Sequence, residues 1–179
     1  MSKKVLLMVC IMAVGVYLNN KAYADEQKYI GVSKCKMCHS SDAKGSQYKI
    51  WSESAHAKAY DTLASEAAKK TAERVGLKTD PQKSAECLKC HVAGFGVKDD
   101  LKVESFNIAN GVQCENCHGA GNDYKGLSTM KDRQKAQEAG LVIPTKETCL
   151  KCHNPESPNY KEFNYDAYYK KIAHPMPKS

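Results

Sequence analysis

An almost unbroken apolar segment occupies residues 5–18, near the start of the chain. A basic pair precedes it, and the small residues of Ala22-Tyr23-Ala24 supply a cleavage site after it. As a helix, this segment is too short to cross a bilayer. The pattern therefore predicts a secretory signal peptide in residues 1–24 and a single exported domain in residues 25–179, located in the periplasm or an equivalent extracytoplasmic compartment.

Beyond residue 24, apolar residues recur at helical spacing in short stretches that turn residues separate. An apolar stripe predicts a helix in residues 47–63, formed by Tyr48, Trp51, Ala55 and Ala59. N-cap residues predict further helices, after Ser65 in residues 66–75, after Ser84 up to residue 91, after Ser128 in residues 129–139 and after Thr145 up to residue 153. A last helix is expected in residues 163–173, and a hairpin or an irregular segment in residues 97–108. The pattern predicts a mainly α fold with little or no sheet.

The sequence Cys-x-x-Cys-His occurs four times, in residues 35–39, 87–91, 114–118 and 149–153. It is the attachment site of c-type haem, in which two thiols add to the porphyrin vinyl groups and the histidine ligates the iron. Zinc knuckles and thioredoxin-type pairs also use Cys-x-x-Cys, but neither explains a histidine after every pair. We therefore expect four covalently bound haem c groups (four irons), attached through Cys35, Cys38, Cys87, Cys90, Cys114, Cys117, Cys149 and Cys152. The ninth cysteine, Cys10, leaves with the predicted signal peptide.

Four haems change how the composition is interpreted. Phe and Trp are scarce, at three residues and one residue, as expected if porphyrins supply the large apolar groups of the core. The formal net charge of +7 falls to +4 without the three lysines of residues 1–24, and haem propionates offset the rest. Only two arginines are present, and no basic run is interleaved with aromatic residues, so nucleic-acid binding is excluded. The lysines are expected to steer redox partner proteins.

The sixth ligand of each iron decides whether the haem transfers electrons or binds small molecules. The proximal ligands are expected to be His39, His91, His118 and His153. Of the six histidines, only His56 and His174 remain, and we expect both to be distal ligands. Met130 and Met176 are methionine candidates for a further distal site, whereas Met37 lies inside a motif and is disfavoured for steric reasons. At least one haem is then expected to be five-coordinate.

The chain resembles the cytochrome c-554 family, tetrahaem electron carriers of ammonia-oxidising bacteria and their relatives. The resemblance covers residues 34–174 and extends beyond the motifs to Ala55-His56-Ala57-Lys58-Ala59, Cys90-His91-Val92-Ala93-Gly94-Phe95-Gly96, Gly111-Val112-Gln113-Cys114-Glu115-Asn116-Cys117-His118-Gly119 and the spacing from Phe163 to His174. It implies a largely helical fold with closely stacked haem pairs. Three irons in this family have two histidine ligands, and the second haem is open.

Carried over to this chain, the resemblance implies that His56 is distal to the haem of His118 and His174 to the haem of His153. It also implies that the haem of His91 is five-coordinate.

The family's distal histidine for the first haem lies after the third motif, where this chain reads Leu127-Ser128-Thr129-Met130. The haem of His39 then has Met130 as its sixth ligand or an open position.

By resemblance, we expect a carrier that accepts electrons from a multihaem oxidoreductase of the hydroxylamine-oxidising type and passes them to another cytochrome or the membrane chain. One alternative is an enzyme that reduces nitric oxide, or a related small nitrogen species, at an open haem. Against it, no spare histidine remains for proton delivery. Another is a permanent subunit of a larger multihaem complex, which a large exposed apolar patch would favour.

Overall fold

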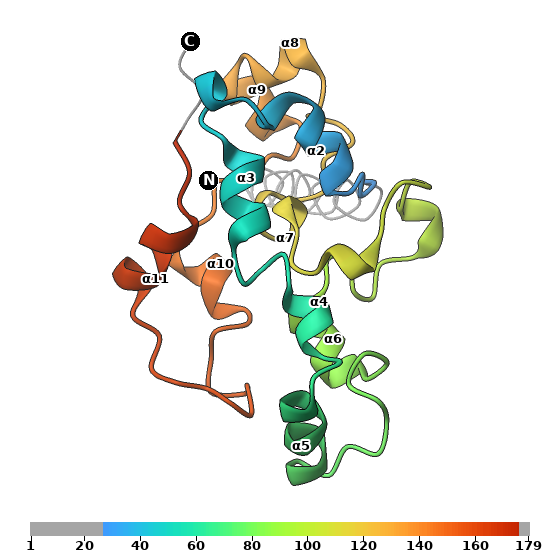
Figure 1. Ribbon diagram of the computed structural model, residues 1–179. Coiled ribbons are helices and arrows are strands. Elements are labelled where there is room, and N and C mark those ends of the chain that lie inside the picture. The colour runs from blue at the N-terminus through green and yellow to red at the C-terminus, as the bar shows by residue number, and fades with distance from the viewer. Residues whose placement is uncertain (1–26, 176–179) are drawn as a thin grey trace, which may run out of the picture.

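The computed structural model describes residues 27–175 (Figure 1). Within these residues the chain forms α-helices and short 3-10 helices but no strand, which confirms the predicted mainly α fold. The only bridge among them is a single parallel one between Tyr29 and Lys102. The predicted signal peptide, Cys10 and Met176 lie outside the described residues. No helix in residues 27–175 is long and apolar enough to span a membrane.

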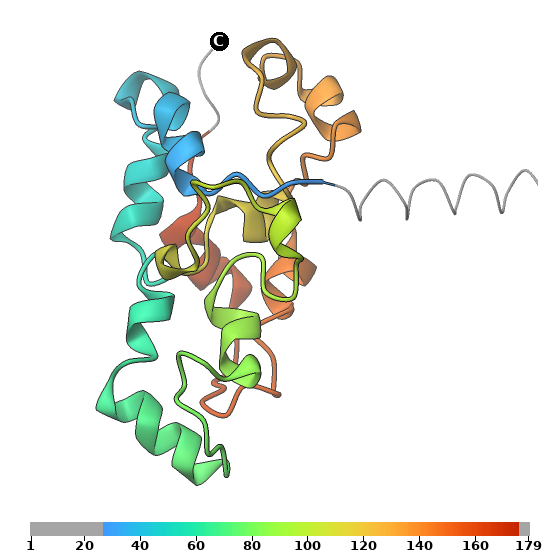
Figure 2. The same ribbon diagram turned by 90° about the vertical axis from the view of Figure 1, so that its right-hand side faces the viewer.

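The helices are short. They are α2 (Val32–His39), η1 (Asp42–Lys44), α3 (Gln47–Glu53), α4 (Ala59–Thr62), α5 (Glu66–Arg74), α6 (Ala85–His91), η2 (Asp99–Leu101), η3 (Ile108–Asn110), α7 (Cys114–His118), α8 (Leu127–Met130), α9 (Arg133–Glu138), α10 (Lys146–Leu150) and α11 (Tyr165–Ile172). Helices α2 to α5 follow one another down one edge of the molecule (Figure 2). Helices α8 and α9 lie at the same end as α2, α10 and α11 lie together on one side, and α7 lies near the centre (Figure 1).

Few apolar side chains are buried in the described part of the chain. The buried ones are Ile30, Val32, Leu63, Ala72, Val92, Ala93, Ala120, Tyr124 and Ala136. Because four of these nine are alanines, the core removes little apolar surface from water for a chain of this length. The fold therefore needs a further apolar component, which is the role predicted for the porphyrins.

A buried carboxylate organises the centre of the molecule. Glu115 in α7 is 2% exposed, and it accepts backbone N–H bonds from Ile30 at 2.9 Å, Gly31 at 2.8 Å and Gly121 at 2.7 Å. Burial raises the pKa of Glu115, and the three N–H bonds oppose that rise by favouring the charged form. The carboxylate thus joins α7 to the segment before α2 and to the segment that follows α7.

Gln113, just before α7, adds further hydrogen bonds to the contact between α7 and the start of α2. Its side chain is 1% exposed, with Oε1 accepting from the Val32 N–H at 2.8 Å and Nε2 donating to the Asn107 carbonyl at 2.9 Å. Val32 is the first residue of α2, so the first and third motifs are joined through buried hydrogen bonds.

Residues 47–63 form two helices, so the prediction of one continuous helix was wrong. The break contains His56, whose carbonyl accepts from the Val112 N–H at 3.0 Å. Trp51 Nε1 donates to the Val112 carbonyl at 2.7 Å. A Cβ at Gly111 would lie 2.6 Å from the His56 oxygen, so only glycine permits this approach. Tertiary contacts with the segment before α7 therefore outweigh the helical pattern at His56.

Other helix boundaries follow their caps to different degrees. Ser65 caps α5 as predicted, accepting from the Ala68 N–H at 3.2 Å. The predicted helix in residues 129–139 is instead the pair α8 and α9, and Asp132, not Ser128, caps the second of them. Thr145 caps α10 with a capping box, but α10 ends at residue 150, before the motif is complete. Residues 97–108 take the irregular alternative.

Gly119 and Gly121 follow the third motif, and their lack of a side chain has a reason within the protein. A Cβ at Gly119 would lie 2.9 Å from the Gly140 carbonyl, and one at Gly121 would lie 2.8 Å from the Ile30 side chain. Close packing within the protein therefore favours glycine at both positions.

Replacing the carboxylate of Glu115 with an amide tests its structural role. Glu115→Gln presents an N–H₂ group to backbone donors that need an acceptor, so we expect a loss of about 1–3 kcal/mol in the free energy of unfolding. Denaturant unfolding followed by circular dichroism measures this loss. The matched control is Glu73→Gln, an exposed glutamate on α5, which should change stability by less than about 0.5 kcal/mol. Equal losses in the two variants would contradict the role of Glu115.

Candidate cofactor site

The four Cys-x-x-Cys-His motifs lie at or near helix ends. The first closes α2, the second closes α6, the third forms α7, and the fourth starts in α10 and continues into the following turn. Two residues three apart on a helix share one face, so each pair of thiols can meet one porphyrin edge. No disulfide joins any two of the eight motif cysteines, so all eight are available for attachment to a porphyrin. In residues 27–175, no three side chains from His, Cys, Asp and Glu converge as they would around a bare metal ion.

Cysteines from different motifs lie next to one another. A hydrogen bond with Cys114, together with burial, raises the pKa of Cys35, and the same bond lowers the pKa of Cys114. Burial and the neighbouring Cys90 raise the pKa of Cys152 to about 12. The first motif therefore adjoins the third, and the second adjoins the fourth.

A third pair of neighbouring cysteines connects these two pairs of motifs. Burial and the nearby Cys149 raise the pKa of Cys117 to about 11. The third motif thus lies beside the fourth, and the motifs follow one another in space in the order first, third, fourth, second.

Two motif histidines are oriented by backbone carbonyls. His91 Nδ1 lies 2.7 Å from the Ala59 oxygen, and His118 Nδ1 lies 3.0 Å from the Val142 oxygen. A carbonyl can only accept, so Nδ1 carries the proton in both rings and the free lone pair is on Nε2. This is the tautomer in which a histidine ligates a metal, with its other ring nitrogen bonded to an outer partner. The residues present therefore fit a haem iron.

His39 and His153 have different surroundings. Nδ1 of His39 is buried without a hydrogen-bond partner, as is Oε1 of Gln47. The ring of His153 stacks on Phe163, with ring centres 4.6 Å apart and planes inclined by 14°. The stack occupies one face of the imidazole and leaves the ring nitrogens, which lie at its edge, available to a metal.

The two remaining histidines lie opposite motif histidines. The ring centres of His118 and His174 are 5.8 Å apart, and those of His56 and His153 are 6.1 Å apart. Two imidazoles that share one iron, each with a metal–nitrogen bond of about 2 Å, have ring centres about 6 Å apart. Burial lowers the pKa of His56, His153 and His174, which favours the neutral form that binds a metal.

This pairing is the reverse of the one that the resemblance implied. His56 lies beside His153 rather than His118, and His174 lies beside His118 rather than His153. The physical reason lies in α11. Phe163 packs on His153 before the helix begins, and eight helical residues, about 12 Å of rise, then carry the chain on to His174.

No histidine is left for the other two motifs. All six histidines of the sequence are accounted for by four motif positions and by His56 and His174. Met130 is half-buried in α8, which lies at the same end of the molecule as α2 and its His39 (Figures 1 and 2). Met37 is 77% exposed.

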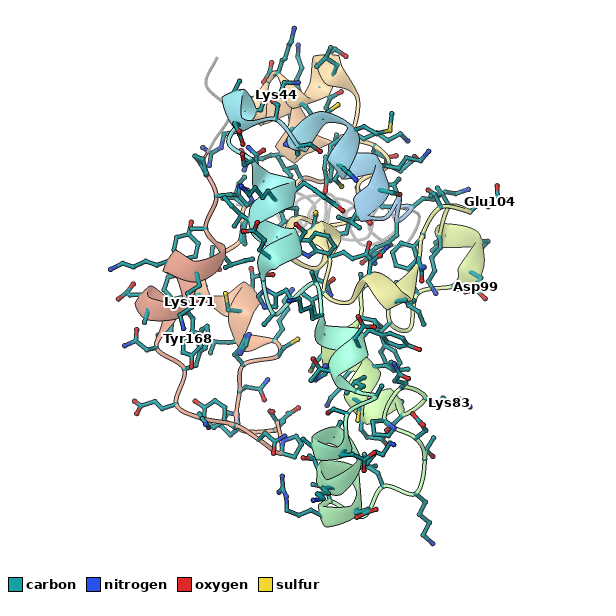
Figure 3. All side chains as sticks on the ribbon, in the orientation of Figure 1. Lys44, Lys83, Asp99, Glu104, Tyr168 and Lys171 are labelled. Carbon is teal, nitrogen blue, oxygen red and sulfur yellow. The ribbon has the colours of Figure 1, made fainter. Side chains whose placement is uncertain are left out.

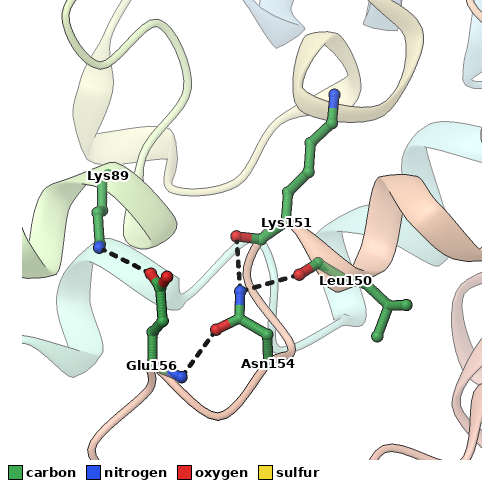
Figure 4. Close-up of polar contacts among 5 residues, drawn as sticks. All are labelled: Lys89, Leu150, Lys151, Asn154 and Glu156. Atoms are coloured by element: carbon green, nitrogen blue, oxygen red, sulfur yellow. Dashed lines mark hydrogen bonds and ion pairs between the residues drawn. The ribbon is translucent and has the colours of Figure 1, made fainter.

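The second and fourth motifs are joined by surface contacts. Lys89, inside the second motif, pairs with Glu156 at 3.4 Å, and Asn154 orders the turn by accepting from the Glu156 N–H at 2.9 Å (Figure 4). Arg74 on α5 donates to the Asn159 side chain at 2.8 Å. Exposed pairs of this kind contribute only about 0–1 kcal/mol each.

Sequence reasoning missed several contributors to the site. The carbonyls of Ala59 and Val142 carry no sequence signal, since any residue supplies a backbone oxygen. Phe163 offered only a weak signal, an aromatic residue after the last motif.

Comparison with known proteins agrees with these features. Residues 34–119, which contain the first three motifs, match the family described as cytochrome c554 and c-prime. The chain is 30% identical over 155 residues to cytochrome c-554 of Nitrosomonas europaea, across 83% of this chain. It spans 63% of the length of that relative. No solved structure matches the chain. The chain belongs to the family of cytochrome c554 and c-prime, and is thus a c-type cytochrome with covalently bound haem c.

Proposed function

We propose that this chain is an exported tetrahaem cytochrome that carries electrons between redox proteins of nitrogen-cycle respiration. The observation that supports this most is the pair of facing histidines at two motifs, because an iron with two histidine ligands is suited to electron transfer rather than to binding small molecules. The donor is a multihaem oxidoreductase of the hydroxylamine-oxidising type, and the acceptor is another cytochrome or the membrane chain. The signal-peptide pattern of residues 1–24 supports export.

Electrons would pass along the haems in the order first, third, fourth, second. Support comes from the neighbouring cysteines, since each thioether sulfur is attached to a porphyrin edge. The contact of Cys35 with Cys114 brings the first and third edges together, and the proximity of Cys90 to Cys152 does so for the second and fourth. The first and third haems then form one pair and the fourth and second haems the other. The third and fourth haems connect the two pairs into one short path.

The four haems differ in their sixth ligands. Those of His118 and His153 are low-spin, closed by His174 and His56. The haem of His91 is five-coordinate, and the haem of His39 has Met130 as its sixth ligand or is open. The histidine count supports this division, as does the location of the half-buried Met130 at the same end of the molecule as α2.

Lysines on several sides of the molecule support brief, charge-guided docking. Lys44, Lys83 and Lys171 project in different directions (Figure 3). The partners are proteins with acidic docking surfaces, and such redox contacts are small and short-lived. Reduction of nitric oxide at an open haem is not part of this proposal, because no histidine remains to deliver protons.

Electron paramagnetic resonance of the oxidised protein, combined with optical spectra and a pyridine haemochrome assay, counts the haems by type. We expect four haems per chain, of which two give low-spin bis-histidine signals. At least one other is expected to be high-spin, because six histidines cannot close four irons. Four bis-histidine signals would overturn this ligand scheme.

The pairing of distal ligands is tested in a variant that lacks the fourth haem, made by Cys149→Ser with Cys152→Ser. In this background His174→Ala should convert the haem of His118 from low to high spin, because it removes the facing imidazole. His56→Ala should leave that haem low-spin and serves as the matched control. A high-spin conversion by His56→Ala instead would restore the pairing implied by the resemblance.

Salt dependence tests the docking mode. The rate of reduction by a hydroxylamine-oxidising multihaem enzyme should fall severalfold between about 10 and 300 mM salt, because screening weakens lysine-guided encounter. Reduction by a small uncharged reductant provides the control and should change little. A protein-donor rate independent of salt would argue against charge-guided docking.

A further inference from the structure

The carboxylate of Glu115 places a negative charge in the interior of the fold. Glu115 is 2% exposed, with Oε1 accepting the N–H groups of Ile30 and Gly121 and Oε2 accepting that of Gly31. A carboxylate that accepts two or three backbone N–H bonds is stabilised in its ionised form. These donors carry no net positive charge, and none of the lysine ion pairs within residues 27–175 involves Glu115. The charge is therefore buried and satisfied by hydrogen bonds rather than neutralised by a lysine.

This charge lies between the attachment cysteines of the first and third motifs. Cys114 of the third motif is the residue directly before Glu115. On the other side, Gly31 gives its N–H to Glu115 at 2.8 Å, and its carbonyl oxygen lies 3.8 Å from Sγ of Cys35 in the first motif. A single residue, Gly31, thus separates the carboxylate from the first sulfur. Both porphyrins that these cysteines would hold are attached beside the same charge.

The other three motifs differ in the charge between their cysteines. Each has an exposed lysine there: Lys36, Lys89 and Lys151. Water and salt screen exposed charges strongly, whereas a buried charge is screened much less. Glu115 is the only acidic residue between the cysteines of any motif. The electrostatic environment of the four attachment sites is therefore uneven, with the negative charge on the side of the first and third motifs.

We propose that Glu115 lowers the reduction potentials of the first and third haems through its buried charge. The inference rests on the proposed function, in which Cys35 and Cys114 hold these haems. Ferric haem carries one more positive charge than ferrous haem, so a nearby negative charge stabilises the ferric form. The low dielectric constant of the interior strengthens this effect. A lower potential makes each of these haems, once reduced, a stronger electron donor to its neighbour.

Glu115→Gln tests this role because it removes the charge and nearly keeps the shape of the side chain. Potentiometric titration, followed optically and by electron paramagnetic resonance, should show two of the four haems with their equilibrium constants for reduction raised about tenfold. This is the effect of a unit charge at about 10 Å with an effective dielectric constant of about 20. Looser packing would instead admit water, which stabilises the ferric form and lowers the potential. The direction of the shift therefore separates the charge from packing.

Gln113→Leu is the matched control. It removes buried hydrogen bonds to Val32 and Asn107 from the same contact without changing any charge. It should therefore lower the free energy of unfolding and raise no potential. Unchanged or lowered potentials in Glu115→Gln, or equal rises in Glu115→Gln and Gln113→Leu, would overturn the inference.

A second variant decides the question if Glu115→Gln does not load four haems. Glu115→Asp shortens the side chain but keeps its charge, so each equilibrium constant for reduction should stay within about a factor of two of its original value. A larger rise would overturn the inference, because the charge is still present. A haemochrome count below four in the unmodified protein would overturn the proposed function instead.

Discussion

A buried carboxylate with three backbone N–H donors lies at the centre of this fold, on the third of four haem-attachment motifs. The chain has few buried apolar side chains, so hydrophobic burial by the polypeptide alone is a weak source of order. Around Glu115 and Gln113, directed hydrogen bonds supply the order that hydrophobic burial does not. These bonds join the segment before α2 to α7, and they bring Cys35 of the first motif against Cys114 of the third.

The two halves of the molecule are held by different kinds of interaction. The first and third motifs share buried hydrogen bonds, which are costly to break because each leaves a donor or acceptor without water. The loop after the fourth motif makes exposed contacts with the second motif, through Glu156 and Lys89, and with α5, through Asn159 and Arg74. Local opening should therefore cost less on the second–fourth side, which is also the side of the proposed five-coordinate haem.

The limits of sequence reasoning appear at particular residues. The cap at Ser65 is local, so its prediction was correct. The helix expected across residues 47–63 is interrupted because Val112, distant in sequence, bonds to the His56 carbonyl. The same kind of distant contact decides the histidine pairs. His56 and His174 could be selected as ligand candidates by counting, but their partners depend on the break at His56 and on the length of α11.

The sequence by itself determined the four motifs, the mainly helical character and the small number of histidines available for distal sites. These follow from composition and short-range spacing, which act within one helical turn. Only the tertiary structure decided which motifs adjoin and which histidine faces which. Such relations join residues far apart in the chain. They depend on the packing of short helices around a centre that backbone hydrogen bonds, rather than a large apolar core, hold in place.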